Sequence, residues 1–188
     1  INMGLGFVES TQMHLEDINS LIQDAKEKAT QSADDSLNAE NREAMAQEIN
    51  SMIEELASLA NGNFDGDYIF NGTEVNGQNP FELIEDPLNP GSYTGVNSPS
   101  DSESMERKFG DHLNIQINIA GGDIDKISEA FGELIALKDA LNANDTNAIS
   151  TQIDKLDDVS SEILKLSTKI GDVHNRITLT EQQLTLTN

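Results

Sequence analysis

Apolar residues recur at alternating intervals of three and four along three long segments of the chain, and this spacing constrains the fold more than any other feature. In a helix such spacing aligns the apolar side chains on a single stripe, the seam along which long helices pack. The sequence therefore predicts long helices packed side by side. The expected seam residues are Leu15, Ile18, Ile22, Ile49, Leu56, Leu59, Phe131, Leu134, Leu156, Ile163, Leu166, Ile170, Val173 and Ile177.

Short polar stretches separate these segments. Residues 34–38 interrupt the first seam, and Ser36 or Asn38 is a candidate N-cap for the second helix, because either side chain can accept a hydrogen bond from a free helix N–H. Asp123 is the candidate N-cap of the third helix. Residues 142–145 break the chain again, before a last segment of about 40 residues that makes a rod of roughly 60 Å.

The middle of the chain has a different pattern. Tyr68–Phe70 followed by Asn71-Gly72 predicts a short strand and a turn. All four prolines lie between residues 80 and 99, which excludes a long helix there. Residues 113–119 alternate between apolar and amide side chains, which predicts a half-buried strand, and residues 105–109 are its expected partner.

These patterns together predict a mainly α protein, an elongated antiparallel helical bundle with a small β-rich insert. Residues 1–63 form the N-terminal helical hairpin of the rod, residues 64–120 the insert, and residues 121–188 the helices that complete the rod.

Acidic residues outnumber basic ones by 34 to 11, for a formal net charge of −23. A surface this acidic repels phosphate backbones and anionic lipid, so neither nucleic acid nor a membrane is an expected partner. The charge is concentrated, because residues 43–106 contain 13 acidic residues and no Lys or Arg. The chain has no Cys, which excludes a disulfide framework, a thiolate nucleophile and a Cys-based metal site.

No set of residues has the spacing that catalysis or a cofactor requires. His14, His112 and His174 lie far apart, without ligand spacing and without a Ser or Glu motif beside them. The stretch Asn61–Gly66 is similar to the start of a calcium-binding loop, but the twelfth position, which needs a bidentate acid, is Gly72. We expect no enzymatic activity, no cofactor and no metal, with a weak calcium site in this loop as the alternative.

Several stretches resemble the bacterial flagellin superfamily. Met13–Glu27 is similar to its first long helix, Arg42–Ile49 to its second, and Ile170–Ile177 to its C-terminal helix. The stretch Tyr68–Phe81 is more specific, because an aromatic strand followed by Asn-Gly-Thr and then Pro-Phe resembles the hook-associated protein type 3 branch, as does Tyr93–Gly95. The residues of this motif are Tyr68, Phe70, Asn71, Gly72, Thr73, Pro80 and Phe81.

This resemblance implies a structural subunit of the flagellum, exported through the flagellar secretion system, that works outside the cell. It would join the hook, through the first hook-associated protein, to the flagellin filament. The implied partners are other copies of the chain in a ring, the other hook-associated protein, flagellin, and an export chaperone bound to the C-terminal segment. The innermost terminal helices of the superfamily have no counterpart here, so we expect a core fragment of a longer chain.

Two alternatives remain at the level of sequence. A small flagellin filament subunit would have the same helices and differ in the segment after Asn71-Gly72-Thr73. A helical extracellular sensory or binding module would have membrane-spanning helices just outside residues 1 and 188.

Overall fold

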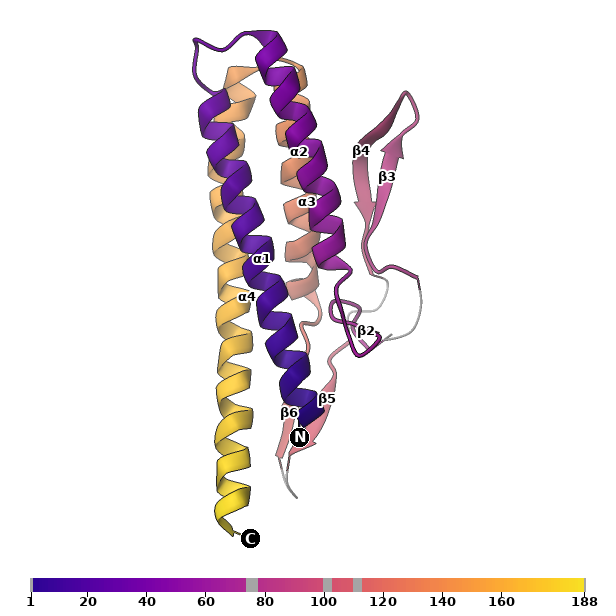
Figure 1. The fold of residues 1–188 in the computed structure, drawn as a ribbon, viewed down its shortest axis with the longest axis vertical. Helices are drawn as coiled ribbons and strands as arrows, with labels where there is room; N and C mark the ends of the chain where they lie inside the picture. Colours follow the sequence, from indigo (N-terminus) through magenta and orange to yellow (C-terminus); the bar gives the residue numbers. More distant parts are fainter. Residues whose placement is uncertain (1, 74–77, 100–102, 110–112, 188) are drawn as a thin grey trace.

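The computed structural model describes residues 2–73, 78–99, 103–109 and 113–187. Within these ranges four helices run up, down, up and down: α1 (Asn2–Ser32), α2 (Ala39–Ala60), α3 (Gly122–Asn142) and α4 (Thr146–Thr187). α1 packs against α2 and α4, and α3 closes the bundle by packing against the same two helices. Figure 1 shows α1 and α4 running on below the ends of α2 and α3. We call the end with both chain termini the lower end, and the end with the α1–α2 and α3–α4 loops the upper end.

The strands of the insert form separate antiparallel pairs. β1 (Asn63–Phe64) pairs with β2 (Asp67–Tyr68), β3 (Glu82–Asp86) with β4 (Asn89–Asn97), and β5 (Glu106–Phe109) with β6 (Leu113–Gln116). Asp65 and Gly66 both have positive φ between β1 and β2, as a tight two-residue hairpin turn requires. The predicted fold class, a mainly α elongated bundle with small β pairs, is confirmed.

The seam residues fill the interior of the bundle. Burial of an aliphatic or aromatic side chain contributes about 1.5–3 kcal/mol, so this seam is the main source of stability. Leu59 and Val173 are half-buried and pack against the core from its margin. The buried seam residues are Leu15, Ile18, Ile22, Ile49, Leu56, Phe131, Leu134, Leu156, Ile163, Leu166, Ile170 and Ile177.

Of the two helix starts considered, one prediction is confirmed and the other is wrong. Asn38 is the N-cap of α2, and its Oδ1 accepts a hydrogen bond from the Asn41 N–H at 2.9 Å. The cap of α3 is Gly121 rather than Asp123. Gly121 has a φ of 60°, which glycine adopts without strain, so the helix is capped two residues before Asp123. Asp123 lies inside the first turn, where its carboxylate accepts a 2.5 Å hydrogen bond from Lys169 of α4.

The strand predictions also need correction. The strand expected at Tyr68–Phe70 is only Asp67–Tyr68, because Ile69 and Phe70 turn inward and are completely buried. The pairing of residues 105–109 with the alternating strand is confirmed, but β6 ends at Gln116 and not at residue 119.

The β3–β4 hairpin has no clear alternation of apolar and polar residues to predict it. Pro87 lies in the turn between β3 and β4, and Pro90 is the second residue of β4. At these positions the missing N–H groups cost little. Figure 1 shows this hairpin standing beside α2 and α3, apart from the other two pairs.

Candidate functional site

The Tyr68–Phe81 motif joins the insert to the bundle. Phe70 is completely buried, and the ring of Phe81 stacks on that of Phe131 in α3, with centroids 5.8 Å apart and planes 20° apart. The side chain of Asn61, at the end of α2, makes two hydrogen bonds to the backbone of Phe81: Oδ1 accepts from its N–H at 2.8 Å, and Nδ2 donates to its carbonyl at 2.7 Å. The motif is thus a structural joint between α2, the insert and α3.

The other motif residues surround this joint. Asn71, Gly72 and Pro80 are buried, and Thr73 is exposed. The Tyr68 hydroxyl donates to Asn79 Oδ1 at 2.8 Å. None of these positions, as far as the structure describes them, forms a pocket with a reactive group.

Asn118 is the centre of a buried polar cluster below this joint. Its Nδ2 donates to the carbonyl oxygens of Gly72 at 3.1 Å and Glu103 at 2.9 Å, and its Oδ1 accepts from the Met105 N–H at 2.7 Å. The period-2 pattern places Asn118 on the exposed face of a strand, and that placement is wrong. In the sequence Asn118 looks the same as Asn114 and Gln116, the other amides of the alternating stretch, so no signal there identifies this role.

Arg42 fastens the upper end. Its buried guanidinium donates to the carbonyl oxygens of Ser32, Asp34 and Leu37 at 2.8–2.9 Å, and to Asn144 Oδ1 at 2.6 Å. The carbonyls lie at the end of α1 and in the α1–α2 loop, where backbone acceptors have no helical partner. The Arg42 side chain therefore donates hydrogen bonds to backbone carbonyls of the α1–α2 loop and connects this loop to the α3–α4 loop.

The β3–β4 hairpin is held against the bundle by hydrogen bonds and by half-buried side chains that pack on the core, Leu83, Tyr93 and Val96. The buried Lys138 of α3 donates from Nζ to the Tyr93 carbonyl at 2.5 Å and to Ser92 Oγ at 3.0 Å. The Tyr93 hydroxyl donates to Glu54 Oε1 of α2 at 2.9 Å, and this hydrogen bond to the carboxylate raises the pKa of Tyr93. Asn50 of α2 donates to the Gly91 carbonyl at 2.7 Å.

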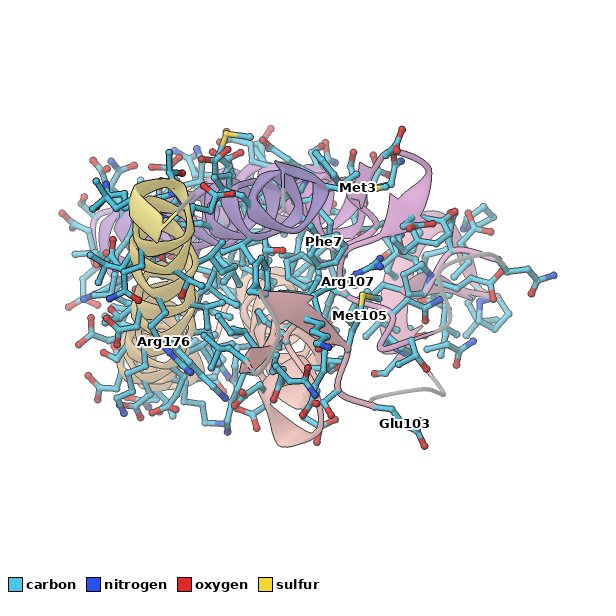
Figure 2. All side chains as sticks on the ribbon, turned by 90° about the horizontal axis from the view of Figure 1, so that it is seen from below. Met3, Phe7, Glu103, Met105, Arg107 and Arg176 are labelled. Carbon is cyan, nitrogen blue, oxygen red and sulfur yellow. The ribbon has the colours of Figure 1, made fainter. Side chains whose placement is uncertain are left out.

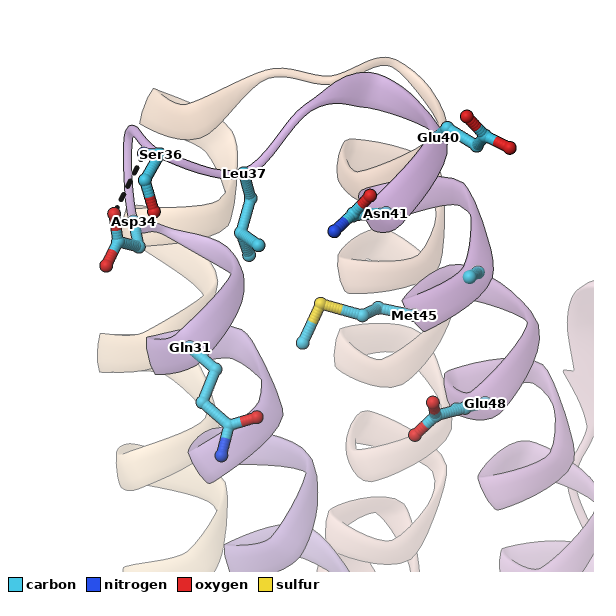
Figure 3. A pocket seen from close by; sticks show the side chains of 9 residues that line it. Gln31, Asp34, Ser36, Leu37, Glu40, Asn41, Met45 and Glu48 are labelled. Atoms are coloured by element: carbon cyan, nitrogen blue, oxygen red, sulfur yellow. Dashed lines mark hydrogen bonds between the residues drawn. The ribbon is translucent and has the colours of Figure 1, made fainter.

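Each end of the bundle has a hollow, and the two differ in charge. The upper hollow, about 760 Å³, lies between α1 and α2 and is lined by Leu37 and Met45 with the carboxylates of Asp34, Glu40 and Glu48 (Figure 3). Asp34 accepts a hydrogen bond from the Ser36 N–H at 2.8 Å, which together with the nearby Arg42 charge lowers its pKa and keeps it ionised.

The lower hollow, about 320 Å³, is lined by Met3, Gly4, Arg107, Lys108 and Phe109. Phe109 of β5 packs on Gly4 so closely that a Cβ there would lie 3.1 Å from the ring. Figure 2 looks onto this end and shows Met3, Arg107 and Arg176 on it.

The described histidines have structural contacts. His14 Nδ1 lies 2.8 Å from the Ser10 carbonyl, and its ring packs on Gly62, where a Cβ would approach within 2.2 Å. His174 Nε2 is 3.2 Å from Glu9 Oε1, and His112 lies outside the described residues.

The described residues form neither a metal site nor a membrane-spanning helix. No group of three or more His, Asp or Glu side chains is arranged to hold a metal ion in the described part of the chain. In the calcium-like loop the side chain of Asn61 is engaged by Phe81, and Glu74 lies outside the described residues. None of the helices, over the residues described, is long and apolar enough to cross a membrane.

Comparison with known proteins gives one family match and several structural ones. Residues 1–75 match the family model of the bacterial flagellin N-terminal helical region. No curated protein sequence matches the chain.

Solved structures share the fold over nearly the whole chain. A FlgL from Bacillus cereus superposes with a TM-score of 0.75 at 18% identity, covering 98% of this chain and 88% of the other. A putative flagellar hook-associated protein from Vibrio parahaemolyticus gives 0.81 at 18% identity, with 99% and 82% covered. The flagellar hook associated protein-3 from Legionella pneumophila gives 0.70 at 11% identity, with 96% and 88% covered. At these identities the likeness establishes a common fold.

Proposed function

We propose that this chain, whose residues 1–75 match the family model of the bacterial flagellin N-terminal helical region, is a structural subunit of the flagellum that joins the hook to the filament. The observation that carries the proposal is the shared fold with hook-associated proteins along almost the full length of both chains. The geometry agrees with a passive role, because the buried polar residues Arg42, Asn118 and Lys138 all bind backbone or structural side chains.

The proposed neighbours are other copies of the chain, the first hook-associated protein on one side, and flagellin on the other. The proposed location is outside the cell, after export by the flagellar secretion system. The chain would act as an adaptor between two tubular lattices, for which a stiff rod with an outward insert is a suitable shape (Figure 1).

Deleting the gene that encodes this chain in its own host tests the proposal. We expect hooks without filaments and unpolymerised flagellin in the medium, with both defects reversed when the gene is restored. A deletion strain that keeps its filaments would overturn the proposal.

The alternative is a small flagellin, which the match of residues 1–75 to the flagellin helical region also favours. The two differ in what the purified full-length protein does alone. A filament subunit polymerises into long filaments, whereas a junction subunit does not. Long filaments formed by the purified protein alone would identify the chain as the filament subunit.

A further inference from the structure

The turn of the β3–β4 hairpin presents a leucine to solvent. Asp86 pairs with Asn89, so the turn consists of Pro87 and Leu88 alone. Leu88 is 86% exposed, more than every other large apolar side chain that the structure describes except Leu186, in the last turn of α4. Such turns usually contain glycine and polar residues, so the fold of a single copy gives no reason for a leucine at this position.

Hydrogen bonds hold this turn in place. The Asp86 carboxylate accepts from Asn89 Nδ2 at 2.7 Å and from the Leu88 N–H at 2.9 Å, and these bonds lower the pKa of Asp86 and keep it ionised. The Glu85 carboxylate accepts from the Gly91 N–H at 3.0 Å. Both carboxylates are therefore engaged by donors of their own hairpin. Because the turn is preorganised, its leucine loses little conformational entropy when a partner buries it.

The upper hollow lies at the same height as this turn, on a different side of the rod. Asn50 of α2 donates to the Gly91 carbonyl, and Glu48, less than one helical turn above Asn50, lines the hollow. From Gly91 the hairpin continues upward to its turn (Figure 1). The hollow opens between α1 and α2, whereas the hairpin stands beside α2 and α3 (Figure 3). Two parallel copies side by side can therefore bring one turn level with one hollow.

The floor of the upper hollow is apolar. Leu37 and Met45 are half-buried, and Figure 3 shows both side chains pointing into the hollow. Two carboxylates beside them are engaged within the chain, since Asp34 is hydrogen-bonded in its own loop and Glu48 is paired with Lys28. The volume of about 760 Å³ is ample for a leucine side chain.

We propose that Leu88 of one copy inserts into the upper hollow of a second copy that stands beside it, with the two rods parallel. The leucine covers Leu37 and Met45 of the second copy. The contact is heterologous, because turn and hollow are different surfaces, and repeated contacts of this kind close a ring where the rotation allows. The inference deepens the proposed function, on which it rests for the arrangement of the copies, and it leaves both ends of each rod to other proteins.

The charge around the contact determines how it depends on salt. Neither the turn nor the lining of the hollow, as far as the structure describes them, includes a Lys or Arg, and both carry carboxylates. The apolar insertion therefore acts against a like-charge repulsion, which salt screens. We expect the contact to strengthen as salt is added, whereas a contact made of ion pairs would weaken.

Cross-linking through engineered cysteines tests the contact, because the parent chain has no Cys. P87C places a thiol beside the intact Leu88, and N41C replaces an exposed side chain that points into the hollow (Figure 3). The two purified full-length variants are mixed at high concentration with a short bis-maleimide, and the mixed dimer is quantified. We expect several-fold more mixed dimer than from N41C with L164C, which carries its cysteine at an exposed position of α4, and a higher yield in high salt.

A second pair of variants changes the leucine alone. P87C/L88S should give about tenfold less mixed dimer with N41C than P87C does, because a buried apolar side chain is lost from the contact. P87C/L88M keeps an apolar side chain of similar size and should retain most of the yield. Leu88 is exposed, so both variants should fold like P87C, which circular dichroism checks.

The outcomes separate this inference from the proposed function. A yield no higher than that with L164C, a yield that L88S leaves unchanged, or a yield that falls in high salt would overturn the contact. Dimers of two P87C chains in place of mixed dimers would indicate that two turns meet, and would also contradict it. Each of these results leaves the gene-deletion test unaffected, and a deletion strain with normal filaments would leave the contact in solution standing.

Discussion

The four-helix bundle and the β3–β4 hairpin are held in place by opposite kinds of contact. The bundle seam is apolar and almost completely buried, as Ile163 and Phe131 illustrate. The hairpin is fastened through Lys138, Tyr93 and Asn50, whose hydrogen bonds include exposed ones that water can replace. A typical net hydrogen bond contributes about 0.5–1.5 kcal/mol, less than one buried aromatic side chain. The chain therefore combines a rod with an apolar core and a hairpin whose attachment depends in part on exposed hydrogen bonds.

The largest effect is expected in the seam. Phe131→Ala removes a completely buried ring that also stacks on Phe81, and should lower the free energy of unfolding by about 3–5 kcal/mol. Urea denaturation followed by circular dichroism measures this loss. Leu164→Ala, which truncates a 56% exposed side chain of α4, is the control and should cost under about 0.5 kcal/mol. Similar losses in both variants would contradict the assignment of the seam as the core.

Arg42 comes next, because its side chain is buried and its four hydrogen bonds are buried or partly buried. Arg42→Met keeps much of the volume but removes the donor to the carbonyls of Ser32 and Leu37, while the Asp34 carbonyl keeps the Leu37 N–H, so we expect a loss of about 2–4 kcal/mol. Hydrogen exchange should increase first in the α1–α2 loop. Arg42→Lys should recover only part of the stability, since an ammonium cannot reproduce the planar fork of donors. Full recovery by Lys would show that charge alone suffices.

The seams and the buried polar residues differ in how far sequence predicts them. Alternating spacing predicts the helices and their inward faces, because burial follows directly from periodicity. Arg42 and Asn118 break that periodicity: among their partners are Asn144 Oδ1 and the Gly72 carbonyl, which are both distant in sequence. Only the tertiary arrangement shows which loop comes within reach, so no local pattern could identify them.

The Tyr68–Phe81 motif is a further case. Its residues are recognisable as a pattern, yet the strand assigned to Tyr68–Phe70 was too long because Ile69 and Phe70 are drawn into the core. The charges of the two hollows cannot be predicted from the sequence either. In the lower hollow, for example, Met3 and Arg107 lie on different elements that come together only in the folded chain.

Asn118 should have an intermediate effect. Asn118→Ala removes the acceptor of the Met105 N–H and the donor to the Gly72 and Glu103 carbonyls, and should cost about 1–3 kcal/mol in a urea titration. Asn114→Ala is the matched control, because Asn114 is exposed on the same hairpin. If the two alanine variants are equally stable, the buried cluster contributes nothing measurable.

Replacing Lys138 tests how the β3–β4 hairpin is attached to the bundle. Lys138→Met preserves the buried stem but removes the hydrogen bonds to Ser92 and Tyr93, so the hairpin should loosen while the bundle loses only about 1 kcal/mol or less. Hydrogen exchange resolved by peptide should therefore rise several-fold in residues 82–97 and stay unchanged in α3. Lys126→Met, which removes only an ion pair with Glu129 within α3, should change neither. A large global destabilisation would mean that the hairpin is an integral part of the core.

The smallest effect belongs to the Tyr93–Glu54 hydrogen bond, and it depends on pH. The Glu54 carboxylate raises the pKa of Tyr93 above its ordinary value of 10.0, so folding favours the protonated phenol. This contribution is fully present below pH 10, where the phenol is protonated in both states, and is lost as the pH rises through the raised pKa of the folded state.

Hydrogen exchange measures this loss. After correction for the intrinsic exchange rate, exchange above pH 10 should increase more in residues 82–97 than in the helices of the bundle. Tyr93→Phe should lose about 0.5 kcal/mol or less at neutral pH and show a smaller alkaline step. The difference between the alkaline steps of the two chains measures the contribution of the Tyr93 phenol. An identical alkaline step in both chains would contradict a role for the Tyr93–Glu54 hydrogen bond.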